Sequence, residues 1–377
     1  MQLYNNLSCS LYRSNHLDSL LARNSTQTHL QAYIFEMMKA IHYTSGGGPP
    51  SCLQLQELPI PTPQPTDLQV RIKACSVNPV DTKIRQGKFP ASDITGYDAA
   101  GIVTKCGSEV VGFKEGDEII YAGRLGAQGS TAQYGLVDYR IAAKKPANWD
   151  WADASSVSLV NITAYEMLVD HFAINTVGQE NAKDSILIIN GAGGVGSAAI
   201  QLARAFGLGN VIVTASRKET IQHAQSLGAT HIIDHHKDLK SQLKEQGFEQ
   251  VKYIMICHST PDYIEQACEI ATTLGKIGSI VECEAPLAFQ SMAAFSKALS
   301  FHWEFMFARA TSNDDKLMKE TGGHLREIVR MCDTGVIKST VTQKFELSSA
   351  NLRKAHEILE SGKAMGKISL TVGEDFN

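Results

Sequence analysis

The pattern of hydrophobic and polar positions divides the chain into stretches of different character. Residues 1–37 show weak periodicity and are rich in Asn, Ser, Gln and His. From residue 38 to about 148, short apolar or alternating runs stand between turn residues, and 68–77 (LQVRIKACSV) alternates as a half-buried strand does. Further strands are predicted at 99–105, 118–121 and 132–143. This stretch therefore predicts a compact β-rich domain.

Beyond residue 150 the pattern changes to alternating helices and strands. Helices are predicted at 151–160 and 163–172, and an almost continuously apolar strand follows at 185–190 (SILIIN). Repeated strand–helix units with such strands indicate a parallel sheet that helices cover on both faces. The later strands are predicted at 210–214, 231–233, 252–257 and 276–283, and the later helices at 195–206, 218–227, 261–273, 315–333 and 350–361. A last strand at 366–371 is expected to rejoin the β-rich domain.

A glycine-rich loop stands between the strand at 185–190 and the helix at 195–206. Gly191, Gly193 and Gly196 fill the frame G-x-G-x-x-G in the strand-to-helix context that supports it. Glycines let the backbone approach a diphosphate closely, and the helix start offers unpaired N–H groups and a positive dipole end. The residues predicted to bind the diphosphate of a dinucleotide are Gly191, Ala192, Gly193, Gly194, Val195 and Gly196.

The end of the next strand indicates which dinucleotide is bound. Proteins that bind NAD usually carry Asp or Glu about 20 residues beyond the motif. Here Ser216, Arg217 and Lys218 stand in that place. A hydroxyl and two cations can hydrogen-bond and neutralise a 2′-phosphate, which a carboxylate would repel. We therefore predict NADPH as the cofactor; the alternative is that the two cations belong to a solvated helix start.

Composition and charge narrow the possible functions. The 377 residues are 43% hydrophobic and 20% charged, an ordinary globular balance, and the formal net charge is −4. No basic excess indicates a nucleic-acid surface, and no apolar run has the roughly 18 residues of a membrane helix. The eight cysteines contain no C-x-x-C pair, which favours reduced thiols in an intracellular protein. We expect neither nucleic-acid nor membrane partners, and a cytoplasmic location.

Residues 1–37 are expected to form a disordered extension, or to reflect an upstream start of the coding sequence. They lack the apolar core of a secretory signal. Basic residues and serines with few acids leave a mitochondrial transit peptide, and thus a mitochondrial location, as the alternative.

Several motifs resemble the medium-chain dehydrogenase/reductase superfamily across residues 38 to about 372. VNPVDTKIR at 77–85, GYDAAG at 96–101 and GFKEGD at 112–117 occur in the family's order and at its separations. TASRKET at 214–220 and SFHWEFMF at 300–307 resemble its quinone-oxidoreductase branch, in particular the zinc-type alcohol dehydrogenase-like members.

The resemblance implies an α/β fold with a β-rich GroES-like catalytic domain and a doubly wound, parallel-sheet Rossmann domain. The catalytic domain would span 38–160, completed by 315–377, and the NADP-binding Rossmann domain would span 161–314. An edge strand near 301–307 would pair across a two-fold axis, as in relatives, and form a homodimer.

The resemblance also allows a test for catalytic zinc. The positions of the relatives' zinc-binding Cys, His-Glu pair and second Cys or His hold Asn78, Tyr97-Asp98 and Leu159. These side chains lack the thiolates and imidazoles that zinc needs. The four-cysteine loop of the structural zinc is missing as well, since 116–139 contains no Cys. The His235-His236 pair is adjacent rather than four residues apart, which suggests a solvated loop. We therefore expect no metal.

By the same resemblance, hydride passes from NADPH to a small-molecule substrate, either a quinone or an α,β-unsaturated carbonyl compound. Negative charge that develops on the substrate oxygen needs a donor or a cation, and the catalytic candidates are Asn78, Tyr97 and Lys83. The residues that fall where relatives contact the nicotinamide end are Thr163, Tyr165 and Lys367. Asn78 could instead cap a short helix at 79–85, Tyr97 could be a wall residue, and Lys83 could be solvated.

Two other functions stay open at this point. One is an enoyl or 2-alkenal reductase, which would reduce an enone or enoyl thioester instead of a quinone. The other belongs to a different class, an NADPH-binding redox sensor or structural protein without turnover.

Overall fold

The computed structural model describes residues 36–43, 48–89, 92–177, 180–373 and 376. The described residues from Met37 onward belong to one compact unit. The expectation for residues 1–37 lies outside the described residues except at Glu36 and at Met37, with which strand β1 begins. Within the described ranges, no helix is long and apolar enough to cross a bilayer.

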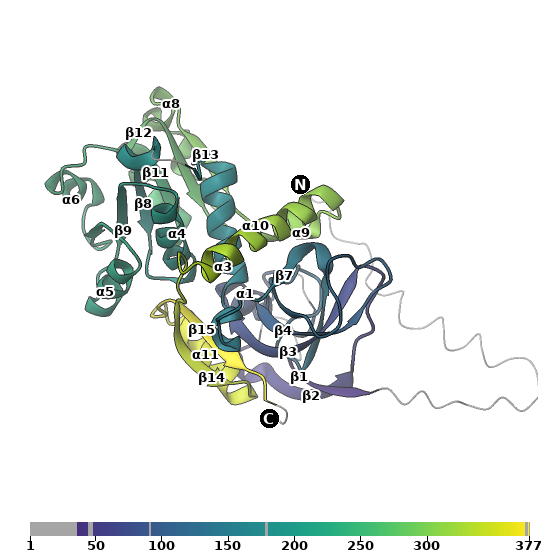
Figure 1. Ribbon diagram of the computed structural model, residues 1–377. Helices are drawn as coiled ribbons and strands as arrows, with labels where there is room; N and C mark the ends of the chain where they lie inside the picture. Colours follow the sequence, from purple (N-terminus) through teal and green to yellow (C-terminus); the bar gives the residue numbers. More distant parts are fainter. Residues whose placement is uncertain (1–35, 44–47, 90–91, 178–179, 374–375, 377) are drawn as a thin grey trace, which may run out of the picture. The chain divides into compact units, whose positions relative to one another are not determined.

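The β-rich part is built around a sheet of seven strands, in the order β14-β15-β3-β4-β5-β7, with β6 paired to β3. The strands are β3 (Asp67–Val77), β4 (Ala99–Cys106), β5 (Glu118–Tyr121), β6 (Tyr134–Asp138), β7 (Ala142–Lys144), β14 (Val341–Glu346) and β15 (Lys367–Thr371). Strand β15 runs antiparallel to β3, so the C-terminal strand belongs to this sheet (Figure 1). The residues at which the two domains divide stay a prediction.

Three details of this part differ from the strands expected from the sequence. The strand predicted at 132–143 is two strands, because the 3-10 helix Tyr139–Ile141 turns the chain between β6 and β7. Strand β14 is not predicted at all, since only every second residue of it is partly buried and its hydrophobic pattern is weak. Strand β2 (Leu53–Pro59) is not predicted either. It forms a separate antiparallel pair with β1 (Met37–Tyr43), whose strand-like run from Met38 is visible in the sequence.

The other part of the fold, in which helices alternate with strands, contains a parallel sheet of six strands, in the order β10-β9-β8-β11-β12-β13. Its strands are β8 (Ser185–Ile189), β9 (Asn210–Thr214), β10 (His231–Ile233), β11 (Val251–Ile256), β12 (Ala271–Ser279) and β13 (Ser300–Trp303). From β8 the chain adds β9 and β10 on one side of the sheet, and it then adds β11, β12 and β13 on the other side. This is the doubly wound arrangement that the sequence predicts, and its switch point lies between β8 and β11.

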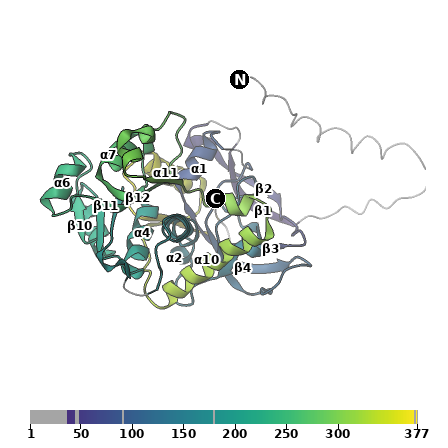
Figure 2. The ribbon, with the colours of Figure 1, turned by 90° about the horizontal axis from the view of Figure 1, so that it is seen from above.

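Helices cover both faces of the parallel sheet, as its continuously apolar strands require. The helices are α4 (Gly194–Ala205), α5 (Lys218–Ser226), α6 (Leu239–Glu245) and α7 (Thr260–Ile270). Helices α4 and α7 lie on opposite sides of β11 and β12 (Figure 2). Along β8, Ile186 and Ile188 pack into one core with α4, whereas Leu187 and Ile189 pack into another with α7. Helix α6 is not predicted from the sequence, and β12 begins and ends earlier than the predicted 276–283.

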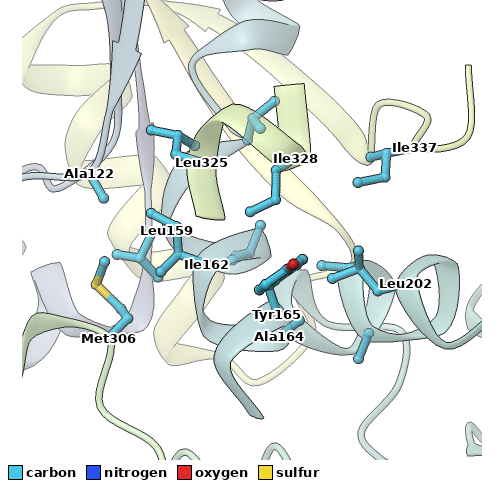
Figure 3. Close-up of a cluster of buried hydrophobic side chains, with 14 of the residues drawn as sticks. Ala122, Leu159, Ile162, Ala164, Tyr165, Leu202, Met306, Leu325, Ile328 and Ile337 are labelled. Atoms are coloured by element: carbon cyan, nitrogen blue, oxygen red, sulfur yellow. The ribbon is translucent and has the colours of Figure 1, made fainter. Parts of the chain in front are cut away.

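The two helices predicted after residue 150 are shorter and differ in kind. They are α2 (Trp151–Ala154) and α3 (Ser158–Tyr165), and α3 continues into a π-helical turn, Glu166–His171. All residues of α3 are buried, which is typical of a helix packed on every side. Its Leu159 and Ile162 lie beside Leu325 and Ile328 of α10 (Asp315–Asp333) (Figure 3).

Strand β13 stands at one end of the six-stranded sheet. Trp303 and Phe305, at and just beyond its end, are 45% and 43% exposed. An end strand next to exposed aromatic rings offers both backbone groups and apolar surface for pairing. This is compatible with the expected homodimer, which stays a prediction.

Candidate functional site

The glycine-rich loop connects the end of β8 to the start of α4. Asn190, directly after β8, has a φ of 63°, and its N–H donates to Thr214 Oγ1 at 2.8 Å, which ties the loop to the end of β9. A Cβ atom at Gly191 would collide with the Val213 side chain, and one at Gly196 would collide with the Gly191 backbone. The packing of the loop itself therefore requires these two glycines.

Gly193 has no such packing reason. Its φ of −74° suits any residue, and the nearest neighbours of a Cβ atom there would all be atoms of Asn190, at 3.2 Å or more. Gly193 is the N-cap of α4, so the unpaired N–H groups of the first helical turn follow directly. A glycine that neither conformation nor packing requires, at a helix start, fits the close approach of a phosphate group.

The C-terminal part of the chain reaches this loop. The Gly366 N–H donates to the Ala192 carbonyl at 2.9 Å. The stem of Lys367 lies next to Gly194, where a Cβ atom would come within 3.1 Å of Lys367 Cδ. The start of β15 therefore joins the seven-stranded sheet to the glycine-rich loop.

Lys367 directs its ammonium group into the protein. The side chain is only 2% exposed, and Nζ donates to the Val77 carbonyl at 3.0 Å, to Asn78 Oδ1 at 2.5 Å and to Asp98 Oδ2 at 3.1 Å. A buried ammonium is stable only when acceptors surround it. These three match its three N–H donors, so the stem lies against the loop while the charge is held by the buried acceptors.

Asp98 is the centre of this buried group. Its Oδ2 also accepts hydrogen bonds from Ser76 Oγ at 2.9 Å and Asn78 Nδ2 at 2.8 Å, and its Oδ1 accepts one from the Leu159 N–H at 2.8 Å. The sequence singles out Asp98 only as a residue unsuited to zinc, and its structural role is not predicted. The one available signal is a carboxylate at the start of the apolar run of β4.

Asn78 caps α1 (Pro79–Arg85) through its backbone rather than its side chain. Its N–H donates to Asp81 Oδ2 at 2.7 Å, and Asp81 Oδ1 accepts a bond from the Gly96 N–H at 3.1 Å. Burial raises the pKa of Asp81 to about 7, although these hydrogen bonds oppose the rise. Both polar atoms of the Asn78 amide are bonded within the group around Asp98. Its catalytic role stays a prediction.

Tyr97 carries a buried donor. Its hydroxyl has no hydrogen-bond partner among the described residues, and its ring meets Phe307 of α9 (Phe307–Thr311) edge-on, with centroids 5.3 Å apart. Burial, and then the charges of Asp81 and Tyr43, raise the pKa of Tyr97 above its usual value. The hydroxyl therefore keeps its proton at neutral pH, as a proton donor must, but a catalytic role for Tyr97 stays a prediction.

Three other predicted residues have partners elsewhere. Lys83 on α1 forms an ion pair with Glu282, which follows β12, with 2.6 Å between Nζ and Oε2. The buried Thr163 hydroxyl donates at 2.8 Å to the carbonyl one turn earlier in its own helix, and Tyr165 packs in the hydrophobic core (Figure 3). The structure does not bring these side chains into the group around Asp98, and no ligand role for Lys83 or Thr163 is tested by it.

The residues predicted to bind a 2′-phosphate lie together at the end of β9. Ser216 is partly buried, whereas Arg217 and Lys218 are exposed at the start of α5. Arg217 Nη2 donates to the Lys363 carbonyl at 3.1 Å, but within the described part of the chain neither cation has a carboxylate partner. Cations at the positive end of a helix dipole are unfavourable unless an anion binds beside them.

The side chains at the relatives' zinc positions do not fit a zinc ion. Asn78 and Leu159 offer neither thiolate nor imidazole, and Tyr97 keeps its proton. The Asp98 carboxylate already accepts several hydrogen bonds, and the Lys367 ammonium supplies the positive charge there. A divalent cation beside that ammonium would be repelled. These residues therefore hold the Lys367 ammonium and do not fit a zinc ion.

A second group has the composition of a metal site. Glu166, Asp170 and His324 place ligand atoms within 4.8 Å of one another. Arg309 Nη1 lies among them, 3.1 Å from Glu166 Oε1 and 2.8 Å from Asp170 Oδ2. The guanidinium forms ion pairs with both carboxylates, so an ion-pair network accounts for the group.

The chain matches two family descriptions, "Alcohol dehydrogenase GroES-like domain" over residues 64–147 and "Zinc-binding dehydrogenase" over residues 194–315. A zinc-type alcohol dehydrogenase-like protein of Staphylococcus aureus (strain Mu50 / ATCC 700699) is 40% identical over 314 residues, which cover 83% of this chain and 92% of that protein. The chloroplastic NADPH-dependent alkenal/one oxidoreductase of Arabidopsis thaliana is 31% identical over 350 residues, which cover 89% of this chain and 80% of that protein.

The solved structure of Escherichia coli quinone oxidoreductase complexed with NADPH has the same fold. It aligns with a TM-score of 0.74 and 27% identity, covering 88% of this chain and 99% of that one. The relationship inferred from the motifs is thus confirmed, as is the combination of a GroES-like domain with a parallel Rossmann sheet. The chain belongs to the medium-chain dehydrogenase/reductase superfamily and is an oxidoreductase of its zinc-type alcohol dehydrogenase-like branch.

Proposed function

We propose that this protein is an NADPH-dependent, zinc-independent reductase that transfers hydride to a quinone or an α,β-unsaturated carbonyl compound. The observation that carries the proposal is the open backbone at Gly193 together with the cations Arg217 and Lys218, one strand away, which have no carboxylate partner among the described residues. A diphosphate at the helix start is common to NADH and NADPH. The further phosphate, beside two cations, is the feature that distinguishes NADPH.

Three sets of residues would hold the cofactor. The loop from Gly191 to Gly196 would bind the diphosphate, and Ser216 with its two neighbouring cations would bind the 2′-phosphate. Lys367, whose stem touches Gly194, and Thr163 would line the nicotinamide side. When bound, NADPH supplies the hydride, and the protein contributes orientation and electrostatics.

The residues around Asp98 would stabilise the charge that develops on the substrate oxygen. Tyr97 is a neutral donor without a competing partner among the described residues, so it is our first choice for hydrogen bonding to that oxygen and for proton donation. The buried Lys367 adds a fixed positive charge. Asn78 would keep that lysine in place, and Lys83 would have to leave Glu282 before it could reach a substrate.

Two relatives support this class of reaction. The Arabidopsis protein is, by its name, an NADPH-dependent alkenal/one oxidoreductase, and the Escherichia coli protein is a quinone oxidoreductase with NADPH bound. A further plant relative, from Solanum lycopersicum and 30% identical, is by its name a 2-methylene-furan-3-one reductase. Quinones and enones both conjugate a carbonyl with a double bond, so one hydride geometry can serve both. A 2-alkenal reductase is accordingly the second candidate.

The proposal is tested by steady-state kinetics with NADPH and NADH against a panel of quinones and a panel of alkenals and enones. We expect turnover with at least one panel and a preference for NADPH. Arg217→Ala should raise the Michaelis constant for NADPH about tenfold or more and leave that for NADH little changed, because one charge-assisted contact to phosphate is lost. Lys316→Ala, which removes an exposed cation of α10, is the matched control.

An unchanged NADPH preference in Arg217→Ala would show that the 2′-phosphate assignment is wrong. Binding of NADPH without oxidation by either panel would favour the redox sensor or structural protein. Zinc at one equivalent per chain in active protein would contradict a zinc-independent reaction.

A further inference from the structure

The loop after β10 lies beside the loop that carries Arg217. Strands β9 and β10 are parallel neighbours with Ile233 opposite Thr214, and the Ala215 N–H donates to the Ile233 carbonyl at 3.0 Å. The segments that follow the two strands therefore leave the sheet at the same edge. The segment that begins with Asp234 and His235 therefore runs next to Ser216 and Arg217, where the 2′-phosphate of the cofactor is proposed to bind.

Two histidines occupy this second loop. His236 is exposed, as the sequence suggests, whereas His235 is partly buried. The rings of His235 and His236 lie 4.2 Å apart, centroid to centroid. The His235 Nδ1 atom is buried and has no hydrogen-bond partner in the described part of the chain. An imidazole nitrogen that is buried without a partner is costly unless a ligand completes it.

Local hydrogen bonds hold the histidine loop in this place. The Asp234 carboxylate accepts a bond from the His236 N–H at 3.0 Å. The Gln242 side chain of α6 accepts from the Asp234 N–H and donates to the Asp234 carbonyl, both at 2.8 Å. The loop is therefore ordered from both sides, and its histidines are positioned before any ligand arrives.

The charges around His235 are mostly positive. Burial lowers the pKa of His235 below its usual value, and His236, His258 and Arg217 lower it further by repulsion, while Asp234 acts in the opposite direction. Three elements thus face this ring: its own loop, which carries Asp234 and His236, the start of α5 with Arg217, and the loop after β11 with His258. Without a bound anion the ring is neutral at pH 7, and a phosphate at this position would reverse the balance.

We propose that His235, together with His236, forms part of the 2′-phosphate site and takes up a proton when the phosphate binds. The preference for NADP(H) over NAD(H) would then strengthen as the pH falls towards neutrality and below. This inference rests on the proposed function, because it needs NADPH at the Arg217 site.

The sign of the effect separates this proposal from binding by Ser216 and Arg217 alone. If an imidazole gains a proton on binding, the dissociation constant of the phosphorylated dinucleotide rises with pH, by up to about tenfold per pH unit for one proton. Without that proton, the phosphate group alone would titrate. Its second pKa is near 6, so it becomes more anionic as the pH rises, and affinity would stay level or increase.

Calorimetric titration of the full chain with NADP⁺ and with NAD⁺ tests the proposal directly. Titrations between pH 6.5 and 8.5, in phosphate-free buffers of different ionisation enthalpy, measure the protons taken up on binding. We expect a fraction of a proton for NADP⁺ at pH 7 and none for NAD⁺. His235→Gln, and more fully His235→Gln with His236→Gln, should abolish the uptake and flatten the pH dependence.

His231→Gln is the matched control. His231 lies at the other end of β10, where its ring packs against Phe248 and its Nδ1 bonds to Thr230 Oγ1. It should leave proton uptake unchanged. NADP⁺ binding whose pH dependence equals that of NAD⁺, or uptake that survives in the double variant, overturns the histidine proposal alone. Absence of NADP⁺ binding at every pH overturns the proposed function as well.

Discussion

Asp98 and Lys367 are 269 positions apart in the chain, yet they form a fully buried ion pair. Burying two charges is costly, and the cost is offset only when hydrogen bonds satisfy both groups. Here Asn78 bonds to both of them, Ser76 and the Leu159 N–H complete the carboxylate, and the Val77 carbonyl completes the ammonium. At the scale of single residues, this network satisfies both buried charges with hydrogen bonds.

Lys367→Met should destabilise the protein by about 3–5 kcal/mol, because it leaves the Asp98 carboxylate buried without a cation. The free energy of unfolding is measured by urea denaturation followed by circular dichroism. Asp98→Asn should lower the free energy of unfolding less in the Lys367→Met variant than in the wild type. In the variant it removes an uncompensated carboxylate, whereas in the wild type it breaks the ion pair.

Lys344→Met is the control for the loss of a lysine ion pair. Lys344 pairs with Asp150 and Asp153 at the surface and is 46% exposed, so its loss should cost no more than about 1 kcal/mol. If the two lysine substitutions lower the free energy of unfolding equally, the buried ion pair contributes no more to stability than the exposed one.

At the scale of elements, the unit that matters most is β8, the glycine-rich loop and α4. Glycine stands in this loop for two different reasons. Gly191 and Gly196 allow the loop to pack on β9 and on itself, whereas Gly193 leaves the backbone at the helix start accessible. Substitutions within these six residues can therefore distinguish an effect on stability from an effect on cofactor binding.

Gly191→Ala should mainly reduce stability, whereas Gly193→Ala should mainly weaken NADPH binding. Gly191→Ala should lower the free energy of unfolding by about 1–3 kcal/mol, because its methyl group collides with Val213. Gly193→Ala should change stability by less than about 1 kcal/mol but weaken NADPH binding about tenfold or more, because the methyl group occupies the phosphate's place. Thermal unfolding and fluorescence titration measure the two quantities.

Each variant serves as the control of the other. If Gly193→Ala binds NADPH like the wild type, the diphosphate does not lie at the start of α4. If Gly191→Ala has the same free energy of unfolding as the wild type, a methyl group fits between the loop and β9, and packing does not require this glycine.

At the scale of the whole molecule, Glu304 joins segments that are distant in sequence. It follows β13, bonds to His171 in the π-helical turn at 2.9 Å, and faces Glu166, which pairs with Arg309 of α9. Burial, and then the charge of Glu166, raise the pKa of Glu304 to about 10. The carboxyl group is therefore neutral in the folded protein at physiological pH.

A raised pKa in the folded state stabilises the protein fully below the ordinary pKa of glutamate, and this contribution is lost as the pH rises towards 10. Glu304→Gln keeps a neutral side chain of similar shape. Its stability relative to the wild type should therefore increase with pH, by up to about 1.4 kcal/mol per pH unit between pH 6 and 9. Urea denaturation at several pH values measures the difference.

The exposed Glu109→Gln should show no such trend. A stability difference for Glu304→Gln that is constant from pH 6 to 9 would mean that Glu304 is ionised in the folded protein, with Arg309 as its counter-charge.

Most elements of the fold could be predicted from local pattern, and the exceptions have identifiable causes. The continuously apolar β8 and the strand–loop–helix unit after it are visible in sequence because every residue of that strand is buried. Strand β14 and helix α6 are missed because only part of each is buried, so their hydrophobic pattern is weak. The π-helical turn after α3 depends on tertiary contacts of Glu166 and His171, which no local propensity records.

The sequence by itself determined the family, the glycine-rich loop between a strand and a helix, and the missing acid after β9, because each is a run of neighbouring residues with its own chemistry. Only the tertiary structure decided that Asp98 holds Lys367, that Lys83 is paired with Glu282, and that the loop of His235 leaves the sheet next to the loop of Arg217. Those partners come from separate strands and helices. Their contacts arise from how the sheets pair and pack, and a linear pattern carries no information about distances between segments that meet only after folding.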